Sequence, residues 1–179
     1  MKNVSKLVAV AVLSAGMLFA SRAMAQMAPA SPPPPPSGVQ LNIGIEGGAV
    51  TGRETSQHGA ALGGILQLEK FTGPSFAMTL STGFDHFFDK TDAFTGADYP
   101  HLDIIPVKLG IKEFFVPNVY IGAEVGAGFV LLNGNVKFIG TPALGWTSSD
   151  HAWDISARYE NYFGTYDYGF IGLRLAHSL

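Results

Sequence analysis

From Val39 to the last residue, apolar and polar side chains alternate with a period of two, and a helical period is hard to find. In the stretch LDIIPVKLGIKEFF (102–115), for example, Val107 and Leu109 lie on one face, while Lys108 and Gly110 lie on the other. Such alternation predicts β-strands whose two faces meet different surroundings. Eight strands are expected, over residues 39–50, 59–71, 75–87, 102–115, 118–132, 136–148, 152–163 and 168–179.

The connections between these strands differ in length. Short turns are predicted near TGP, VPN and SSD, and four further connections contain TGRETSQH, FDKTDAFTGADYPH, NGN and GTYD. Short turns at one end and mostly longer loops at the other are typical of outer-membrane barrels. Pro106 and Pro142 fall inside two of the strands, and because proline has no N–H to donate, we expect the sheet to be weakened there.

Charged residues on the polar face suggest which face is inside. That face consists mostly of Gly, Ala, Ser and Thr, with five acidic and five basic residues spaced along it. A charged side chain that is sealed from water must be paired with an opposite charge. Equal numbers of acidic and basic residues therefore predict that the polar face lines the interior of the barrel. An eight-stranded barrel is just wide enough for side chains to fill it. The predicted lumen charge network consists of Glu46, Glu69, Lys108, Lys112, Glu124, Lys137, Asp154, Arg158, Glu160 and Arg174.

The opposite face carries Leu, Ile, Val and Phe on most strands, as contact with lipid requires. The fold class predicted is therefore all-β, an eight-stranded antiparallel up-and-down transmembrane β-barrel. A soluble, lipocalin-like barrel that encloses a ligand with its apolar face stays open as an alternative. Ten aromatic residues near strand ends are expected to form girdles at the two membrane interfaces: Phe71, Phe87, Phe88, Tyr99, Phe114, Phe115, Tyr162, Phe163, Tyr166 and Tyr168.

The first 38 residues have a different composition from the rest. Lys2 and Lys6 precede an apolar run from Leu7 to Ala20, and Ala23-Met24-Ala25 follows, which predicts a signal peptide over 1–25 and export. Residues 26–38 include five consecutive prolines and are expected to form a stiff linker. The barrel domain is predicted over 39–179.

Charge and cysteine content exclude several classes of function. Three of the 11 Lys and Arg lie in the predicted signal peptide, which leaves 8 of them against all 14 Asp and Glu, so no basic surface for nucleic acid is expected. The chain has no cysteine, which excludes disulfides and thiolate metal sites.

Few residues suggest chemistry. Glu54, Ser56 and His58 have the residue types of a catalytic triad, but such types are common in loops, and no catalytic residue is predicted. A group of aspartates around the longest loop is interpreted as a solvated acidic loop, because its spacing matches no compact calcium loop. No metal and no cofactor are predicted. The aspartates around the longest loop are Asp85, Asp89, Asp92, Asp98 and Asp103. Rim or interface positions are expected for His86, His101, His151 and His177.

The segments IPVKLGIKEFFVPNVYIGAEVGAGF, DISARYENYF and YGFIGLRLAHSL resemble the small outer-membrane β-barrel proteins of Gram-negative bacteria, grouped as OmpA/OmpX-like or "porin family" domains, with Bacteroidota-type members the most similar. The resemblance covers 39–179 and implies an outer-membrane location, contact with lipids and lipopolysaccharide, and insertion by the barrel assembly machinery. Members usually end in an aromatic residue, whereas this sequence ends in Leu179, which predicts a poor insertion signal. Lipid A deacylases are similar in the last hairpin, but Asn161 and Phe163 stand where they carry a catalytic histidine and serine.

The function expected is non-enzymatic: a barrel with a charge-plugged lumen and a structural or surface-interaction role through the loops around Arg53 and Asp92. A narrow ion-conducting channel lined by Lys108, Glu124 and Arg174 is one alternative. The soluble periplasmic ligand-binding barrel is another.

Overall fold

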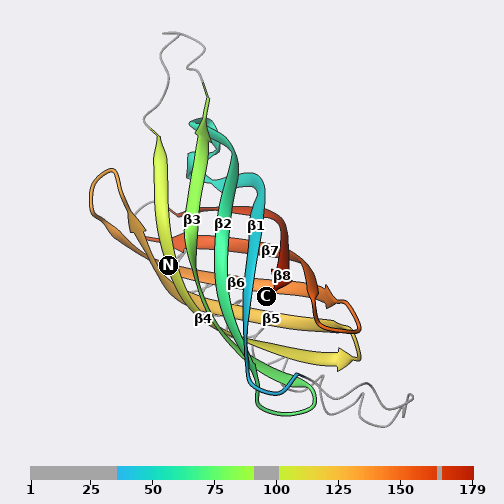
Figure 1. Cartoon of the computed structure of the whole chain (residues 1–179). Helices are drawn as coiled ribbons and strands as arrows, with labels where there is room; N and C mark the ends of the chain where they lie inside the picture. Colours follow the sequence, from blue (N-terminus) through green and yellow to red (C-terminus); the bar gives the residue numbers. More distant parts are fainter. Residues whose placement is uncertain (1–35, 91–100, 165–166) are drawn as a thin grey trace, which may run out of the picture. The chain divides into compact units, whose positions relative to one another are not determined.

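The computed structural model describes residues 36–90, 101–164 and 167–179; the predicted signal peptide and most of the predicted linker lie outside these ranges. Eight antiparallel strands form a closed barrel, which confirms the predicted fold class (Figure 1). A short 3₁₀ helix, Arg53–Ser56, follows the first strand. The strands are β1 (Val39–Gly52), β2 (His58–Phe71), β3 (Phe76–Asp89), β4 (Leu102–Val116), β5 (Val119–Val130), β6 (Val136–Thr147), β7 (Trp153–Phe163) and β8 (Tyr168–Ser178).

Each strand pairs with the next along the chain, and β1 pairs with β8 over eleven residue pairs to close the sheet. No strand edge is left open by this pairing, so every strand has two hydrogen-bonded neighbours. We call the end with the β2–β3, β4–β5 and β6–β7 connections the turn end, and the opposite end the loop end. Among the described residues, none of the helical segments has the length and apolar character needed to cross a bilayer.

Pro106 and Pro142 each interrupt one ladder of the sheet without ending a strand. Pairing between β3 and β4 stops at Thr82 and Val107 and resumes at Asp85. The Thr82 hydroxyl donates to the Pro106 carbonyl at 2.9 Å across this gap. Pairing between β6 and β7 likewise skips Pro142. Each proline still pairs with β5 on its other side, so the expected weakening is confined to one ladder per proline.

Alternate residues of every strand point into the barrel. Along β4, mostly buried inward residues run from the loop end to the turn end, and the residues between them are partly or fully exposed, with Leu109 62% exposed. The polar face is therefore the inner face. The inward set of β4 is Leu102, Ile104, Pro106, Lys108, Gly110, Lys112 and Phe114.

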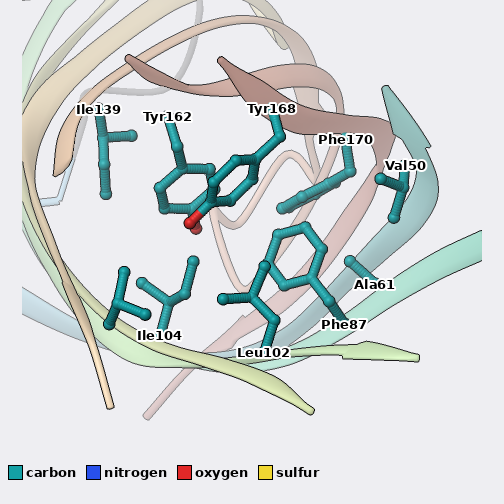
Figure 2. Close-up of a cluster of buried hydrophobic side chains, with 10 residues drawn as sticks. Val50, Ala61, Phe87, Leu102, Ile104, Ile139, Tyr162, Tyr168 and Phe170 are labelled. Atoms are coloured by element: carbon teal, nitrogen blue, oxygen red, sulfur yellow. The ribbon is translucent and has the colours of Figure 1, made fainter. Parts of the chain in front are cut away.

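Aromatic and aliphatic side chains fill the lumen at the loop end (Figure 2). Tyr162 and Tyr168 stack with ring centroids 5.4 Å apart, and the Phe87 ring meets both edge-on. We call this group the loop-end apolar cluster. Its members are Val50, Ala61, Phe87, Leu102, Ile104, Val130, Ile139, Tyr162, Tyr168 and Phe170.

A smaller apolar cluster fills the turn end. Ala77, Phe114 and Tyr120 are buried there, with Phe71 packed against them. His151, in the turn between β6 and β7, lies edge-on to Phe71 and Phe114, and its partial burial lowers its pKa below the ordinary value.

These two clusters correct the girdle prediction for five aromatic residues, of which Phe71 packs against the turn-end cluster. Phe87, Phe114, Tyr162 and Tyr168 are at most 8% exposed and face the interior. Tyr99 and Tyr166 lie outside the described residues. The aromatic residues that face outward near the strand ends include Phe88, Phe129 and Phe138 at the loop end and Trp146 and Trp153 at the turn end.

Gly145 makes room for the Tyr120 ring, because a Cβ at Gly145 would lie 2.2 Å from the Tyr120 Cζ atom. We predict that Gly145→Ala lowers the free energy of unfolding by about 1–3 kcal/mol, as overpacking does. Gly64→Ala is the matched control, since its Cβ would meet nothing within 4 Å. Urea unfolding in detergent micelles measures both, and equal effects would contradict the inward position of the Tyr120 ring.

Candidate functional site: the charge clusters of the lumen

The middle of the lumen holds a network of buried ion pairs, which we call the central charge cluster. The shortest pairs join Lys108 Nζ to Glu160 Oε2 at 2.5 Å and Arg158 Nη2 to a carboxylate oxygen of Glu124 at 2.6 Å. All members are at most 7% exposed. They are Glu46, Lys108, Glu124, Arg158, Glu160 and Arg174.

Two arginines hold this cluster together by sharing their partners. Arg174 lies 2.7 Å from Glu46 and 2.9 Å from Glu124. Arg158 contacts the same two glutamates at 3.2 and 2.6 Å. Because Glu46 and Arg174 stand opposite each other in the β1–β8 register, one of these pairs also spans the seam where the barrel closes. The others cross the lumen.

A second, smaller group lies nearer the turn end and is called the turn-end charge cluster. Lys112 Nζ lies 2.5 Å from Glu69 and 2.8 Å from Asp154. The Tyr120 hydroxyl donates to the other Asp154 oxygen at 2.8 Å, and the Asn42 amide donates to Glu69 at 3.4 Å. Both carboxylates therefore have at least two donors.

The buried set differs from the predicted one in two residues. Lys137 is only partly buried, and its Nζ lies 5.3 Å from the centroid of the Tyr168 ring, near the loop end. Asp85 is 1% exposed and faces the lumen, although the sequence suggested an acidic loop around it. Asp85 stands four positions after Ser81 on β3, and in a strand with period two both side chains therefore point to the same, inner face. This alternation is the sequence signal that identifies Asp85 as inward.

With Asp85 counted, the described interior holds six buried carboxylates and four buried Lys and Arg side chains, so the expected equality of charges does not hold there. The carboxylates belong to Glu46, Glu69, Asp85, Glu124, Asp154 and Glu160. The bases are Lys108, Lys112, Arg158 and Arg174.

Little space remains between these side chains. A cavity lined by residues of both charge clusters, among them Lys112, Glu124 and Arg174, measures about 10 Å³. A single water molecule needs about 10–15 Å³, so this cavity admits at most one. In the part of the chain that the structure describes, packed side chains occupy the barrel axis.

Several histidine–aspartate pairs lie near the loop end. Asp89 lies between two histidines, 3.2 Å from His58 and 2.5 Å from His101. His86 lies 2.6 Å from Asp103, and both are about one-third exposed. His58, considered above as a triad member, thus faces Asp89, while Asp92 and Asp98 fall outside the described residues.

No protein-family model matches this chain, and no curated protein matches it. Solved structures of similar fold include Ail, the attachment invasion locus protein of Yersinia pestis. A crystal structure of Ail has a TM-score of 0.56 at 12% identity, covering 80% of this chain and 100% of the Ail chain. Ail in phospholipid nanodiscs has a TM-score of 0.58 at 15% identity, with the same coverage.

A third Ail structure, a complex with the heparin analogue sucrose octasulfate, has a TM-score of 0.55 at 14% identity and covers 79% of this chain and 97% of the other. At such identities the likeness concerns the fold. This chain shares the closed eight-stranded barrel of these outer-membrane proteins.

Removing the Lys108 ammonium would leave Glu160 and its neighbours with uncompensated buried charge. We predict that Lys108→Met lowers the free energy of unfolding by about 3–5 kcal/mol. Lys137→Met is the matched control and is expected to cost about 0.5–1 kcal/mol, because Lys137 is only partly buried and lies outside the central charge cluster.

Urea unfolding of the two variants measures the difference. The double variant Lys108→Met/Glu160→Gln should cost less than the sum of its single variants, since the two groups contact each other. Equal costs for the two lysine variants would contradict a buried charge cluster.

Proposed function

We propose that this chain is an outer-membrane barrel with a plugged lumen, and that its role is non-enzymatic: structural support of the envelope or contact with partners at the surface. The observation that carries the proposal is the orientation of its faces. Large apolar side chains such as Leu109 and Leu173, each 62% exposed, cover much of the outside, while the members of the two lumen charge clusters are sealed inside. A barrel in lipid needs this arrangement.

Dimensions support the same proposal. The strands have 11 to 15 residues, and a transmembrane β-strand needs about 9–11. The outward aromatic residues near the two ends, Phe138 and Trp146 among them, fit the girdles of a barrel at two interfaces. The soluble ligand-binding alternative requires an apolar cavity, whereas charged residues line the 10 Å³ cavity of the lumen.

A narrow ion channel is the second candidate, because Arg158 and Arg174 share Glu46 and Glu124 as partners. Side chains with two partners each could exchange them and open a path. The apolar clusters at both ends of the lumen favour the plug over the channel.

The loop end is the surface we propose for contact with partners, around Arg53 and Asp92, with the membrane lipids and lipopolysaccharide against the outer face. Insertion by the barrel assembly machinery and membership of the OmpA/OmpX-like group are part of this proposal. Ail binds a sulfated heparin analogue. In this chain, the connections at the loop end carry two basic residues, Arg53 and Lys90, and four acidic ones, Glu54, Asp92, Asp98 and Asp167. Because acidic residues outnumber basic ones, we do not propose that this chain binds a polyanion.

Leucines with equal exposure but different heights on the barrel test the membrane placement. Leu173 lies in the middle of β8 and is 62% exposed, whereas Leu132 lies in the β5–β6 connection and is 61% exposed. In lipid vesicles, Leu173→Lys should lower the free energy of unfolding by about 2–4 kcal/mol, and Leu132→Lys by no more than about 1 kcal/mol. A soluble barrel would tolerate both changes equally, and that result would refute the proposal.

Cell fractionation and conductance test the location and the plug. The chain is expected in the outer-membrane fraction, with a mobility in SDS gels that changes on boiling, because a closed barrel resists the detergent. In planar bilayers it should pass almost no current. Steady unitary currents would favour the channel, and recovery from the soluble periplasmic fraction would favour the ligand-binding barrel.

A further inference from the structure

Three carboxylates converge where the central charge cluster meets the loop-end apolar cluster. One oxygen from each of Glu46, Asp85 and Glu160 lies within 4.8 Å of the others, and all three residues are at most 1% exposed. They come from β1, β3 and β7, so the barrel closure itself brings them together.

Each of these carboxylates has at least one oxygen engaged by the protein. Glu46 Oε2 accepts from Arg174 at 2.8 Å, and Glu160 Oε2 accepts from Lys108 at 2.5 Å. Asp85 Oδ2 accepts from the Tyr162 hydroxyl at 2.7 Å. These three contacts occupy three of the six oxygens.

Of the other three oxygens, two lack a donor within the described residues, and the third shares its donor with Asp85. Glu46 Oε1 and Asp85 Oδ1 are sealed from solvent and accept no hydrogen bond from the described part of the chain, in which Lys108 Nζ lies 3.6 Å from Glu46 Oε1. Glu160 Oε1 has only the Tyr162 hydroxyl, 2.7 Å away, which is also 2.7 Å from Asp85 Oδ2. Since a hydroxyl has one proton, it cannot donate fully to both carboxylates. A buried acceptor without a donor is costly, and a charged one more so.

Charge points the same way. The central charge cluster and Asp85 together place four carboxylates against three bases, and the whole described interior places six against four. Buried charge must be paired or must coordinate a metal. One divalent cation would bring the described interior to neutrality.

We propose that Glu46, Asp85 and Glu160 form a binding site for a hard divalent cation with the size of Ca²⁺, set under the loop-end apolar cluster. Carboxylate oxygens are the donors that hard cations prefer. Ca²⁺ binds oxygen at about 2.3–2.6 Å, so donors on opposite sides of the ion stand up to about 5 Å apart. The site depends on the closed barrel and is independent of the role proposed for it.

The Tyr162 hydroxyl beside the site provides an optical probe, because Tb³⁺ replaces Ca²⁺ at oxygen sites and emits when a nearby tyrosine is excited. The full chain would be folded in detergent with Tb³⁺ or with Ca²⁺, passed through a desalting column, and assayed for Tb³⁺ emission and for calcium content. We expect about one ion per chain. Asp85→Asn should lower the affinity about tenfold or more by removing one charged ligand.

Glu69→Gln is the matched control, because it removes a buried lumen carboxylate from the turn-end charge cluster without touching the site. It should keep the ion. The mobility of unheated samples in SDS gels shows that each variant is folded. Should Asp85→Asn fail to fold, the urea midpoint of the unmodified chain and of Glu69→Gln should still rise with added Ca²⁺ and fall with chelator, since an ion that binds only the folded state stabilises it.

Two results would overturn the site. The first is that the unmodified chain retains no Tb³⁺ or calcium and that its urea midpoint does not change with added Ca²⁺ or chelator. This result would mean that a proton, and not a metal ion, neutralises Asp85. The second is equal retention of the ion by Asp85→Asn and by the unmodified chain, which would place the ion elsewhere.

Discussion

Burying charge in a closed sheet is the constraint on which the rest of this barrel depends. Lys108, Arg158 and Arg174 cannot reach water from the middle of the lumen, so each must lie against carboxylates. That requirement explains why arginine, with its several donors, takes the two positions that contact both Glu46 and Glu124 at 3.2 Å or less. It also explains the small inward residues, such as Gly110 and Gly145, which leave room for longer side chains of the neighbouring strands.

The apolar clusters at both ends strengthen these pairs. With Phe87 and Tyr162 on one side and Phe114 and Tyr120 on the other, water is kept from the ions between them. Attraction between charges rises as the effective dielectric constant falls, and so does the cost of leaving one unpaired. The same seal therefore makes the lumen both stable when its charges are matched and sensitive to any single substitution.

Much of this arrangement could be predicted from the alternation of residues, because period two assigns each side chain to a face. The same counting identifies Tyr162, two positions after Glu160, and Phe87, two after Asp85, as inward. They were assigned to girdles because aromatic residues near strand ends usually mark a membrane interface, a rule that ignores phase. The period of two does not show how far along the barrel axis a side chain lies. Lys137 was therefore expected in the same lumen charge network as the other nine residues. The partners across the lumen depend on the stagger of the strands, so no pattern within one strand reveals that Lys108 meets Glu160.

The ion pair between Glu46 and Arg174 joins the first strand to the last across 128 residues. Contacts so distant in the chain are expected to form late, because closing the intervening loop loses conformational entropy before the contact can stabilise the chain. Folding of this barrel is thus expected to be slow and to finish with the zipping of β1 onto β8, a step in which two charges shed their water together. Until that moment both outer strands are open edges, and the half-built sheet is the species most exposed to aggregation.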